Sequence, residues 1–248
     1  MGLLIKWKCY YIDDMKKAIF FDLYGTLAGF SPSRFQIQSE ACRMFNIELT
    51  EGGILKGYAS ADQFMAEQNK NQPLRLMNAD QKLEFFSRYE QKILQGCDVE
   101  TDLATASKIW AAIREIPYDM QVYDDVVPCL NMLKLDGLVV GIISNMNISG
   151  LDLINKFQLS ESVDFAVTSL EVGLEKPHKR IFQEALNRSK VDSYEAVHVG
   201  DQIESDIKGA ENAGLQPILL DRDGNHVGYK ECPRIETMEV LKSVVTCL

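Results

Sequence analysis

Acidic side chains stand at two places where a short apolar run ends and a turn begins. Asp22 follows residues 18–21, while Asp201 follows residues 196–199 and lies five positions before Asp206. In an open α/β sheet the ligand site lies beyond the carboxyl ends of the strands, so these carboxylates are expected in one cleft. Three carboxylates about 5 Å apart would repel by roughly 3 kcal/mol per pair at an effective dielectric near 20. A divalent cation or a proton must relieve that repulsion.

Side chains that could hold an anion occur at the same kind of position. Thr26 offers a hydroxyl and a backbone N–H to the cleft of Asp22. Ser144 and Asn145 follow the apolar run 139–143, and N–H groups at such a strand-to-helix turn attract anions because helix N-termini carry partial positive charge. Lys176 precedes a helix-like stretch, and a fixed lysine there would neutralise an anionic intermediate. Alone, the Ser-Asn pair is commonly a helix cap and most lysines are solvated.

The elements that must position these residues are short apolar runs separated by helix-like stretches. Near-continuous apolar runs of this kind indicate parallel strands that are buried on both faces. The alternation predicts an α/β fold with a doubly wound, Rossmann-like parallel-sheet core. The expected strands are residues 18–21, 138–143, 163–168, 196–199 and 217–220.

Between the first two of these runs the pattern is helical. Residues 78–97 open with Asn78 and Gln81 in capping-box positions, and residues 102–116 carry apolar side chains at helical spacing. Helices are also expected over 33–46 and 54–67. The predicted organisation is an extension at 1–16 that is poorly ordered and without function, a core formed by 17–30 and 119–248, and an all-helical insertion at 31–118.

Composition limits the classes of partner and compartment. The 248 residues are 46% hydrophobic and 25% charged, with a formal net charge of −10, which argues for solubility and against a nucleic-acid surface. The six cysteines include no Cys-x-x-Cys pair, which favours reduced thiols in a cytoplasmic protein. Residues 1–16 are too short for a membrane span and lack a signal-peptidase site, so no membrane association is expected. Nothing in the sequence indicates the oligomeric state.

The segments that carry Asp22, Ser144, Lys176 and Asp201 resemble, in this order, the four motifs of the haloacid dehalogenase (HAD) superfamily. The string Phe-Phe-Asp-Leu-Tyr-Gly-Thr-Leu at 20–27 resembles its nucleophile loop, and the helical insertion stands where subfamily I members carry a C1 cap. The resemblance extends from Lys17 to about Leu241. Its implied roles are Asp22 as the nucleophile, Thr26 beside it, Ser144, Asn145 and Lys176 on the transferred group, and Mg²⁺ held by Asp22, Asp201 and the Tyr24 carbonyl, with Asp206 as a direct ligand or its support.

One position departs from the phosphatases of that superfamily. Most of them have an aspartate, which protonates the leaving group, where this chain has Tyr24. The string Asp-Leu-Tyr-Gly-Thr-Leu also resembles the first motif of the 2-haloacid dehalogenases, in which halide leaves without a proton. Those enzymes work without metal, replace the acidic fourth motif, and carry a tyrosine six residues after the motif lysine, where this chain has Phe182. No arginine can be assigned to their halide-binding position.

The resemblance and the acidic cluster together favour one hypothesis over two alternatives. The favoured one is a Mg²⁺-dependent phosphatase-type hydrolase of a small phosphorylated metabolite that acts through an aspartyl-phosphate, and Tyr24 would contact its substrate. Loss of a positioned general acid costs about 10² to 10⁴ in rate, or about 3 to 5 kcal/mol, so good leaving groups should suffer least. The alternatives are a 2-haloacid dehalogenase with an ester intermediate on Asp22, and a catalytically weak regulatory protein that binds phosphate and metal. A lid over the site suggests a small anionic molecule as the partner.

Overall fold

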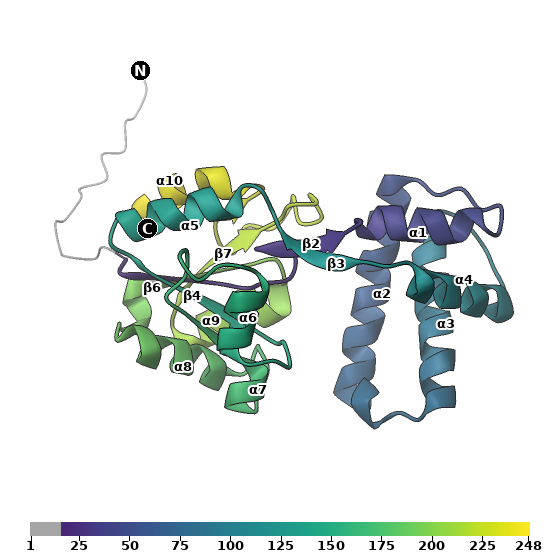
Figure 1. Ribbon diagram of the computed structural model, residues 1–248, viewed down its shortest axis with the longest axis horizontal. Helices are drawn as coiled ribbons and strands as arrows, with labels where there is room; N and C mark the ends of the chain where they lie inside the picture. The colour runs from purple at the N-terminus through teal and green to yellow at the C-terminus, as the bar shows by residue number, and fades with distance from the viewer. Residues whose placement is uncertain (1–15) are drawn as a thin grey trace, which may run out of the picture. The chain divides into compact units, whose positions relative to one another are not determined.

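The computed structural model of the chain describes residues 16–248 and divides them into two compact units (Figure 1). One unit contains the described residues up to Gly29 together with Val122–Leu248, and the other is Phe30–Gln121. The expected insertion at 31–118 falls within the second unit. Of the expected extension, residues 1–15 lie outside the described part of the chain.

The first unit is built on a six-stranded sheet in the order β5-β4-β1-β6-β7-β8, in which every recorded pair is parallel. The order places β1 at the centre, between β4 and β6, where the strand order reverses direction. This is the topological switch point at which open α/β sheets bind ligands. The strands are β1 (Ala18–Phe21), β4 (Val139–Ser144), β5 (Phe165–Thr168), β6 (Ala196–Gly200), β7 (Gln216–Leu220) and β8 (Arg234–Ile235).

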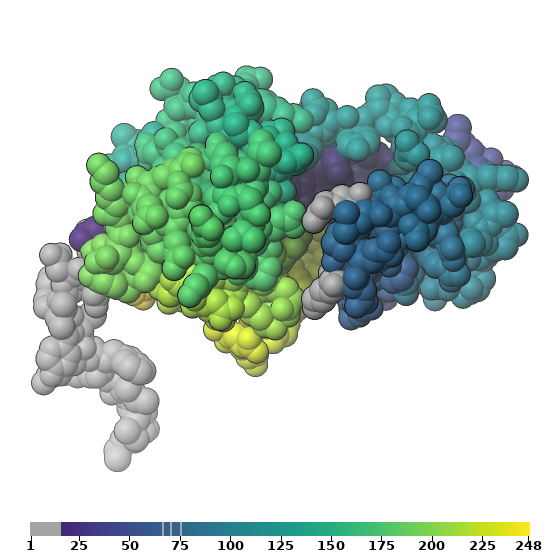
Figure 2. All heavy atoms as spheres, turned by 90° about the horizontal axis from the view of Figure 1, so that it is seen from below, coloured from purple at the N-terminus to yellow at the C-terminus, as the bar shows by residue number. Residues whose placement is uncertain are grey.

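Helices cover both faces of this sheet, so the predicted doubly wound α/β fold is confirmed. In Figure 1, α5 and α10 lie above the strands, and α8 and α9 lie below them. Figure 2, which views the molecule from below, shows the green segment that contains α7 and α8 at the surface of this unit. The helices are α5 (Val126–Leu135), α6 (Gly150–Lys156), α7 (Ser169–Val172), α8 (Lys179–Ser189), α9 (Lys208–Ala213) and α10 (Leu241–Thr246), with 3₁₀ turns at η2 (Ser193–Glu195) and η4 (Met238–Val240) and a π-helical turn at η3 (Ile203–Ile207).

The central strands form because their side chains are almost all apolar and buried on both faces. Every residue of β1 and β6 is buried, and the only polar side chain among them is that of His198. Phe20 packs against Phe165 of β5 with ring centroids 5.9 Å apart. The five strands expected from apolar runs are all present, with ends within two residues of the expected ones.

The second unit is helical, as its sequence pattern predicts. Ser33 and Asn78 each accept a hydrogen bond from the third residue of the following helix and complete capping boxes with Gln36 and Gln81. Its elements are α1 (Arg34–Arg43), α2 (Glu51–Asn71), the 3₁₀ turn η1 (Leu74–Leu76), α3 (Ala79–Gln95) and α4 (Leu103–Glu115).

Close packing and aromatic stacking hold this unit together. The backbones of α2 and α3 approach so closely that a Cβ added to Gly57 would lie 2.2 Å from the carbonyl oxygen of Ile93. The rings of Phe86 and Trp110 stack at 4.6 Å, and those of Phe64 and Phe85 at 4.9 Å. These aromatic side chains belong to the apolar core of the helical unit.

A two-stranded sheet joins β2 (Ala28–Ser31) to β3 (Asp119–Val122), the strands on which the chain enters and leaves the helical segment (Figure 1). Neither strand was expected from the sequence. The residues of β3 alternate between exposed and half-buried positions, and each strand is four residues long. Neither segment contains the near-continuous apolar run from which the other strands are predicted.

The structure bears on two further expectations, those about membrane association and about the cysteines. Within residues 16–248, no helix has both the length and the apolar character that a membrane crossing needs. The cysteines in the same range, Cys42, Cys97, Cys129, Cys232 and Cys247, are free thiols.

Candidate active site

The first predicted site residue, Asp22, begins a tight turn directly after the central strand β1. Its backbone N–H donates to the carbonyl oxygen of Val199 on β6 at 2.9 Å, so the strand pairing extends one residue past β1. The turn closes when the N–H groups of Leu27 and Ala28 both donate to the carbonyl oxygen of Leu23 at 2.8 Å. Asp22 is 8% exposed, so its carboxylate is largely removed from solvent.

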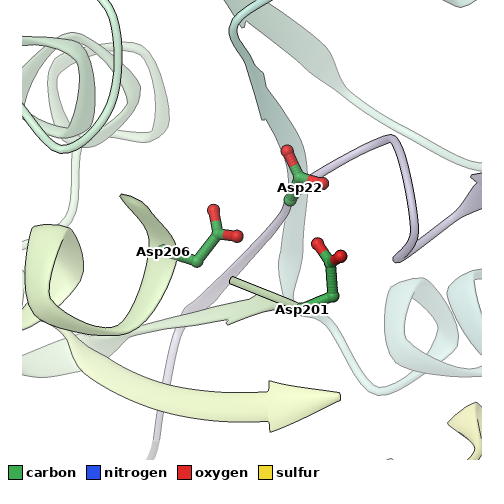
Figure 3. A group of neighbouring side chains, drawn as sticks. All are labelled: Asp22, Asp201 and Asp206. Carbon is green, nitrogen blue, oxygen red and sulfur yellow. The ribbon is translucent and has the colours of Figure 1, made fainter. Parts of the chain in front are cut away.

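Two further carboxylates come from the end of the neighbouring strand. Asp201 follows β6, and Asp206 lies in the π-helical turn η3, where its Oδ2 accepts the N–H of Gln202 at 3.1 Å. Ligand oxygens of Asp22, Asp201 and Asp206 all lie within 4.8 Å of one another. Figure 3 shows the three side chains pointing toward a common centre. The structure therefore brings together all three acidic residues that the sequence singled out.

Lys176 lies between two of these carboxylates. Its Nζ donates to Oδ1 of Asp22 and, at 2.7 Å, to Oδ1 of Asp206, and its side chain is 2% exposed. Burial alone would lower the pKa of Lys176, but the two carboxylates hold it above its ordinary value. The lysine is therefore a fixed positive charge rather than a solvated surface residue.

The three carboxylates differ in how far neighbouring positive groups offset their negative charge. Burial raises the pKa of Asp22 to about 6 against the opposing effect of Lys176. Burial and the charges of Asp22 and Asp206 raise the pKa of Asp201 well above its ordinary value. Burial would also raise the pKa of Asp206, but Lys176 and His198 hold it below the usual range. One lysine thus leaves two of the three groups in need of a further positive charge.

Ser144 and Asn145 stand at the end of β4, as predicted, but their contacts differ. Ser144 is 3% exposed, and its Oγ accepts the N–H of Met146 at 3.3 Å. Asn145 binds the backbone of Lys176 twice: its Nδ2 donates to the lysine carbonyl at 3.2 Å, and its Oδ1 accepts the lysine N–H at 2.7 Å. Asn145 therefore fixes the segment that carries the buried lysine.

Thr26 and Tyr24 occupy the turn that follows Asp22. The hydroxyl of the buried Thr26 lies 3.5 Å from Oδ1 of the partly buried Asp201, which is a long hydrogen bond. Tyr24 is half-buried, and its backbone bridges to Ala28. Both Asp22, before the turn, and Thr26, within it, therefore lie near Asp201.

Two residues outside the sequence-based selection contact this group. His198 is fully buried and places its Nε2 3.1 Å from Oδ1 of Asp206, and its Nδ1 has no hydrogen-bond partner among the described residues. Its ring packs edge-on against Phe182 at 5.1 Å. Arg222 donates two hydrogen bonds to the carbonyl oxygen of Thr26. A histidine inside a strand and an arginine after one carry no sequence signal for these contacts.

The residues present fit a divalent cation. The converging ligands are all carboxylate oxygens, which Mg²⁺ prefers, and they bring three negative charges toward one lysine. The backbone leaves room because residue 25 is glycine: a Cβ there would lie 2.4 Å from Oδ2 of Asp201. Within residues 16–248, this is the only group of at least three acidic, histidine or cysteine side chains with ligand atoms close enough to share an ion.

Comparisons with known proteins agree with this geometry. A family model described as haloacid dehalogenase-like hydrolase matches residues 16–214. The chain is 32% identical over 128 residues to a glyceraldehyde 3-phosphate phosphatase of Methanopyrus kandleri, covering 51% of this chain and 54% of the relative. It is 34% identical over 120 residues to a ribulose-1,5-bisphosphate 5-phosphatase of Halopiger xanaduensis, covering 48% of this chain and 49% of the relative. The matches thus span about half the length of these curated relatives.

Solved structures show the same fold over nearly the whole chain. A 2-haloacid dehalogenase from Pseudomonas syringae superposes with a TM-score of 0.54 at 23% identity, covering 94% of this chain and 99% of that protein. At this level of identity the likeness shows the fold and does not discriminate between reactions. The choice between leaving groups therefore depends on the side chains of the site.

Proposed function

Because the chain belongs to the haloacid dehalogenase-like hydrolase family, we propose that it is a Mg²⁺-dependent phosphatase that hydrolyses a small phosphorylated metabolite. The observation that carries this proposal is the convergence of Asp22, Asp201 and Asp206 within 4.8 Å around one buried lysine. A site that displaced only halide would have no use for the uncompensated acidic charge. The two relatives described above are a glyceraldehyde 3-phosphate phosphatase and a ribulose-1,5-bisphosphate 5-phosphatase, which supports the same substrate class.

In the proposed reaction an oxygen of Asp22 attacks the phosphorus atom. The bond from phosphorus to the leaving oxygen breaks, that oxygen departs with the electron pair and gains a proton from water, and the phosphoryl group remains on Asp22. Water then attacks phosphorus, which releases inorganic phosphate and restores the carboxylate. Lys176 already donates to Oδ1 of Asp22, so it orients the nucleophile and offsets negative charge during both steps.

A bound Mg²⁺ would lower the repulsion between the carboxylates and a phosphate dianion. Asp22, Asp201 and the Tyr24 carbonyl are its proposed ligands, and Asp206 supports them through its contacts with Lys176 and His198. Ser144 and Asn145 complete the proposed phosphate site at the end of β4, the serine through its hydroxyl and the asparagine through its hold on Lys176. Thr26 adds its hydroxyl beside Asp201.

Tyr24 limits the substrates that should react well. A tyrosine at this position does not supply the carboxylic acid that protonates a poor leaving group, so phenyl and acyl phosphates should react faster than alkyl phosphates. The rival reading, displacement of halide from a 2-haloacid, fits Tyr24 but not the acidic turn at Asp201 and Asp206. The other rival is a weakly active protein that only binds metal and phosphate.

The decisive experiment measures release of nitrophenol from p-nitrophenyl phosphate and of halide from 2-chloropropionate, each with Mg²⁺ and with excess chelator. Phosphatase activity that disappears with chelator supports the proposal. Metal-independent halide release would reverse it in favour of a dehalogenase. Binding of Mg²⁺ and beryllofluoride without turnover of a broad phosphate panel would favour the regulatory alternative.

The matched variants are Asp22→Asn and Asp223→Asn. The first removes the proposed nucleophile with almost no change of shape and should abolish turnover. The second makes the same chemical change at an exposed position in the loop after β7 and should leave activity unchanged. Equal activity of both variants would eliminate Asp22 as the nucleophile.

A further inference from the structure

Arg222 links the turn that carries the proposed nucleophile to a distant part of the same unit. It follows β7, and its Nε and Nη2 both donate to the carbonyl oxygen of Thr26, at 3.1 and 3.0 Å. Its Nη1 and Nη2 also donate to the two carboxylate oxygens of Asp125, each at 2.9 Å. One guanidinium thus makes four hydrogen bonds, two to a backbone carbonyl and two to a carboxylate. Its planar set of five donors permits this arrangement, whereas an ammonium has only three donors.

This arrangement is itself firmly fixed. The side chains of Arg222 and Asp125 are each 16% exposed, and the guanidinium lies 4.2 Å from the centre of the Tyr123 ring. Oδ2 of Asp125 also accepts the N–H of Met238 at 3.0 Å. Burial would raise the pKa of Asp125, but the bonds from Arg222 and Met238 lower it, so the carboxylate stays charged. The arginine therefore has a rigid partner against which to hold Thr26.

The carbonyl of Thr26 is a sensitive point in the site. The hydroxyl of the same residue faces Oδ1 of Asp201. The preceding Gly25 has a φ of +84° and lies so close to that carboxylate that an added Cβ would be 2.4 Å from its Oδ2. A shift of Thr26 would carry along the Tyr24 carbonyl and change the distance between Asp22 and Asp201. The backbone N–H of Tyr123 adds a parallel link, because it donates to the carbonyl of Leu27 at 3.1 Å.

We propose that Arg222 is a positioning residue for the nucleophile turn: it fixes the Thr26 carbonyl against Asp125 and so holds Asp22 and Asp201 at reactive separation. The expected effect on kcat rests on the proposed function. The expected effect on the rigidity of the turn does not depend on it. Misplacement of catalytic groups by about 1 Å costs on the order of 10²-fold in rate, so loss of this contact should lower kcat far more than it changes KM.

A matched control exists on the adjoining strand β8. Arg234 also has a side chain 16% exposed and binds a carboxylate, that of Asp221 at 2.7 Å, but its recorded partners are Asp221 and Glu236, outside the nucleophile turn. Arg222→Lys and Arg234→Lys therefore make the same change in two ion-paired environments. Lysine keeps the positive charge in both variants, which limits the loss of folding stability. With three donors it cannot reproduce the four hydrogen bonds of Arg222 to Thr26 and Asp125. Arg222→Gln is the stronger variant to use if it folds.

The test combines amide hydrogen exchange with steady-state kinetics on p-nitrophenyl phosphate. We expect Arg222→Lys to accelerate exchange at the N–H groups of Gly25, Leu27 and Ala28 at least about tenfold relative to Arg234→Lys. The N–H of Asp164, which donates to the carbonyl oxygen of Val140, serves as an internal reference. We expect kcat to fall by about 10 to 100-fold with KM within about threefold. Equal exchange of those three amides in the two lysine variants would overturn the proposal, even if the wild-type protein hydrolysed nothing. Inactive wild-type protein with the expected exchange pattern would refute the proposed function alone.

Discussion

Gly25 and Asp201 are packed so closely that no side chain fits between them: a Cβ on residue 25 would lie 2.4 Å from Oδ2 of the aspartate. The glycine also has a φ of +84°, a left-handed conformation that other residues adopt only at a cost. One residue thus meets both the turn geometry after β1 and the space that the carboxylate needs.

Gly25→Ala should therefore lose metal binding as well as stability. The added methyl group must displace Asp201, so Mg²⁺ should no longer raise the thermal midpoint, whereas it should stabilise the wild type by about 2.7 kcal/mol at a hundred times its dissociation constant. Gly137→Ala is the control, since Gly137 has a φ of +86° but nothing within 4 Å of an added Cβ. Both variants should lose about 1 to 2 kcal/mol from backbone strain. A full Mg²⁺ effect in the residue 25 variant would contradict the assignment of Asp201 to the metal.

Tyr24→Asp should restore a general acid and widen the range of substrates. We expect hydrolysis of alkyl phosphates to rise by about 10² to 10⁴, and that of p-nitrophenyl phosphate to change far less, because nitrophenolate leaves without a proton. Comparison of kcat/KM for the two substrate types measures the effect. Tyr24→Phe separates the contribution of the phenol: a loss confined to alkyl substrates would show that the tyrosine hydroxyl itself donates the proton.

Lys176→Met should destabilise the protein when no divalent cation is present. Removal of one member of a buried ion pair typically costs about 3 to 5 kcal/mol, because the partner carboxylates stay buried without compensation. The double variant with Asp206→Asn should recover part of the loss, as measured by chemical denaturation. Lys208→Met, which breaks the exposed pair of Lys208 with Glu204, should change stability by less than about 1 kcal/mol. Equal effects of the two lysine variants would show that the site does not depend on the buried charge.

A buried glutamate in the helical unit should make its stability depend on pH. Glu90 on α3 is fully buried, its Oε1 accepts a hydrogen bond from Gln38, and its Oε2 has no partner among residues 16–248. Burial raises the pKa of Glu90 to about 8 from an ordinary 4.5. The folded protein therefore binds more protons than the unfolded chain between these values, so the free energy of unfolding falls as pH rises through that window.

Glu90→Gln should remove this dependence. The variant should match the wild type near pH 4.5 and exceed its stability by an amount on the order of a few kcal/mol above pH 8. Denaturation at several pH values between 4.5 and 8.5 tests the difference. Glu84→Gln on the same helix is the control, because Glu84 is 59% exposed and pairs with Arg88. Parallel pH curves for the wild type and Glu90→Gln would show that Glu90 is ionised in the folded protein.

The sequence pattern was sufficient where structure depends on local periodicity. Apolar runs located the strands that end at Asp22 and Asp201, and capping residues such as Asn78 located helix starts, because both signals lie within a few neighbouring residues. The cluster of Asp22, Asp201 and Asp206 could also be predicted, because parallel strands bring their carboxyl ends to one edge of the sheet.

Contacts between residues distant in sequence could not be predicted from the sequence pattern. Arg222 meets Thr26 across 196 positions, and nothing near either residue encodes the pairing. The role of Asn145 is similar: its place after β4 was predicted, but its two bonds to the backbone of Lys176 depend on how two loops fold together. The strands β2 and β3 were missed because each has only four residues, without a continuous apolar run, and such a segment looks like a loop until its partner is known.

The pairing of β2 with β3 has a consequence for how such proteins diversify. The chain departs for the helical segment and returns from it on hydrogen-bonded neighbours, so the two ends of that segment are already adjacent. A segment whose two ends lie on paired strands can be exchanged between relatives as a unit, because the positions of β2 and β3 need not change. Chimeras spliced within Ala28–Ser31 and Asp119–Val122 would then exchange the helical segment between homologues and leave Asp22, Asp201 and Asp206 on their own strands and turns.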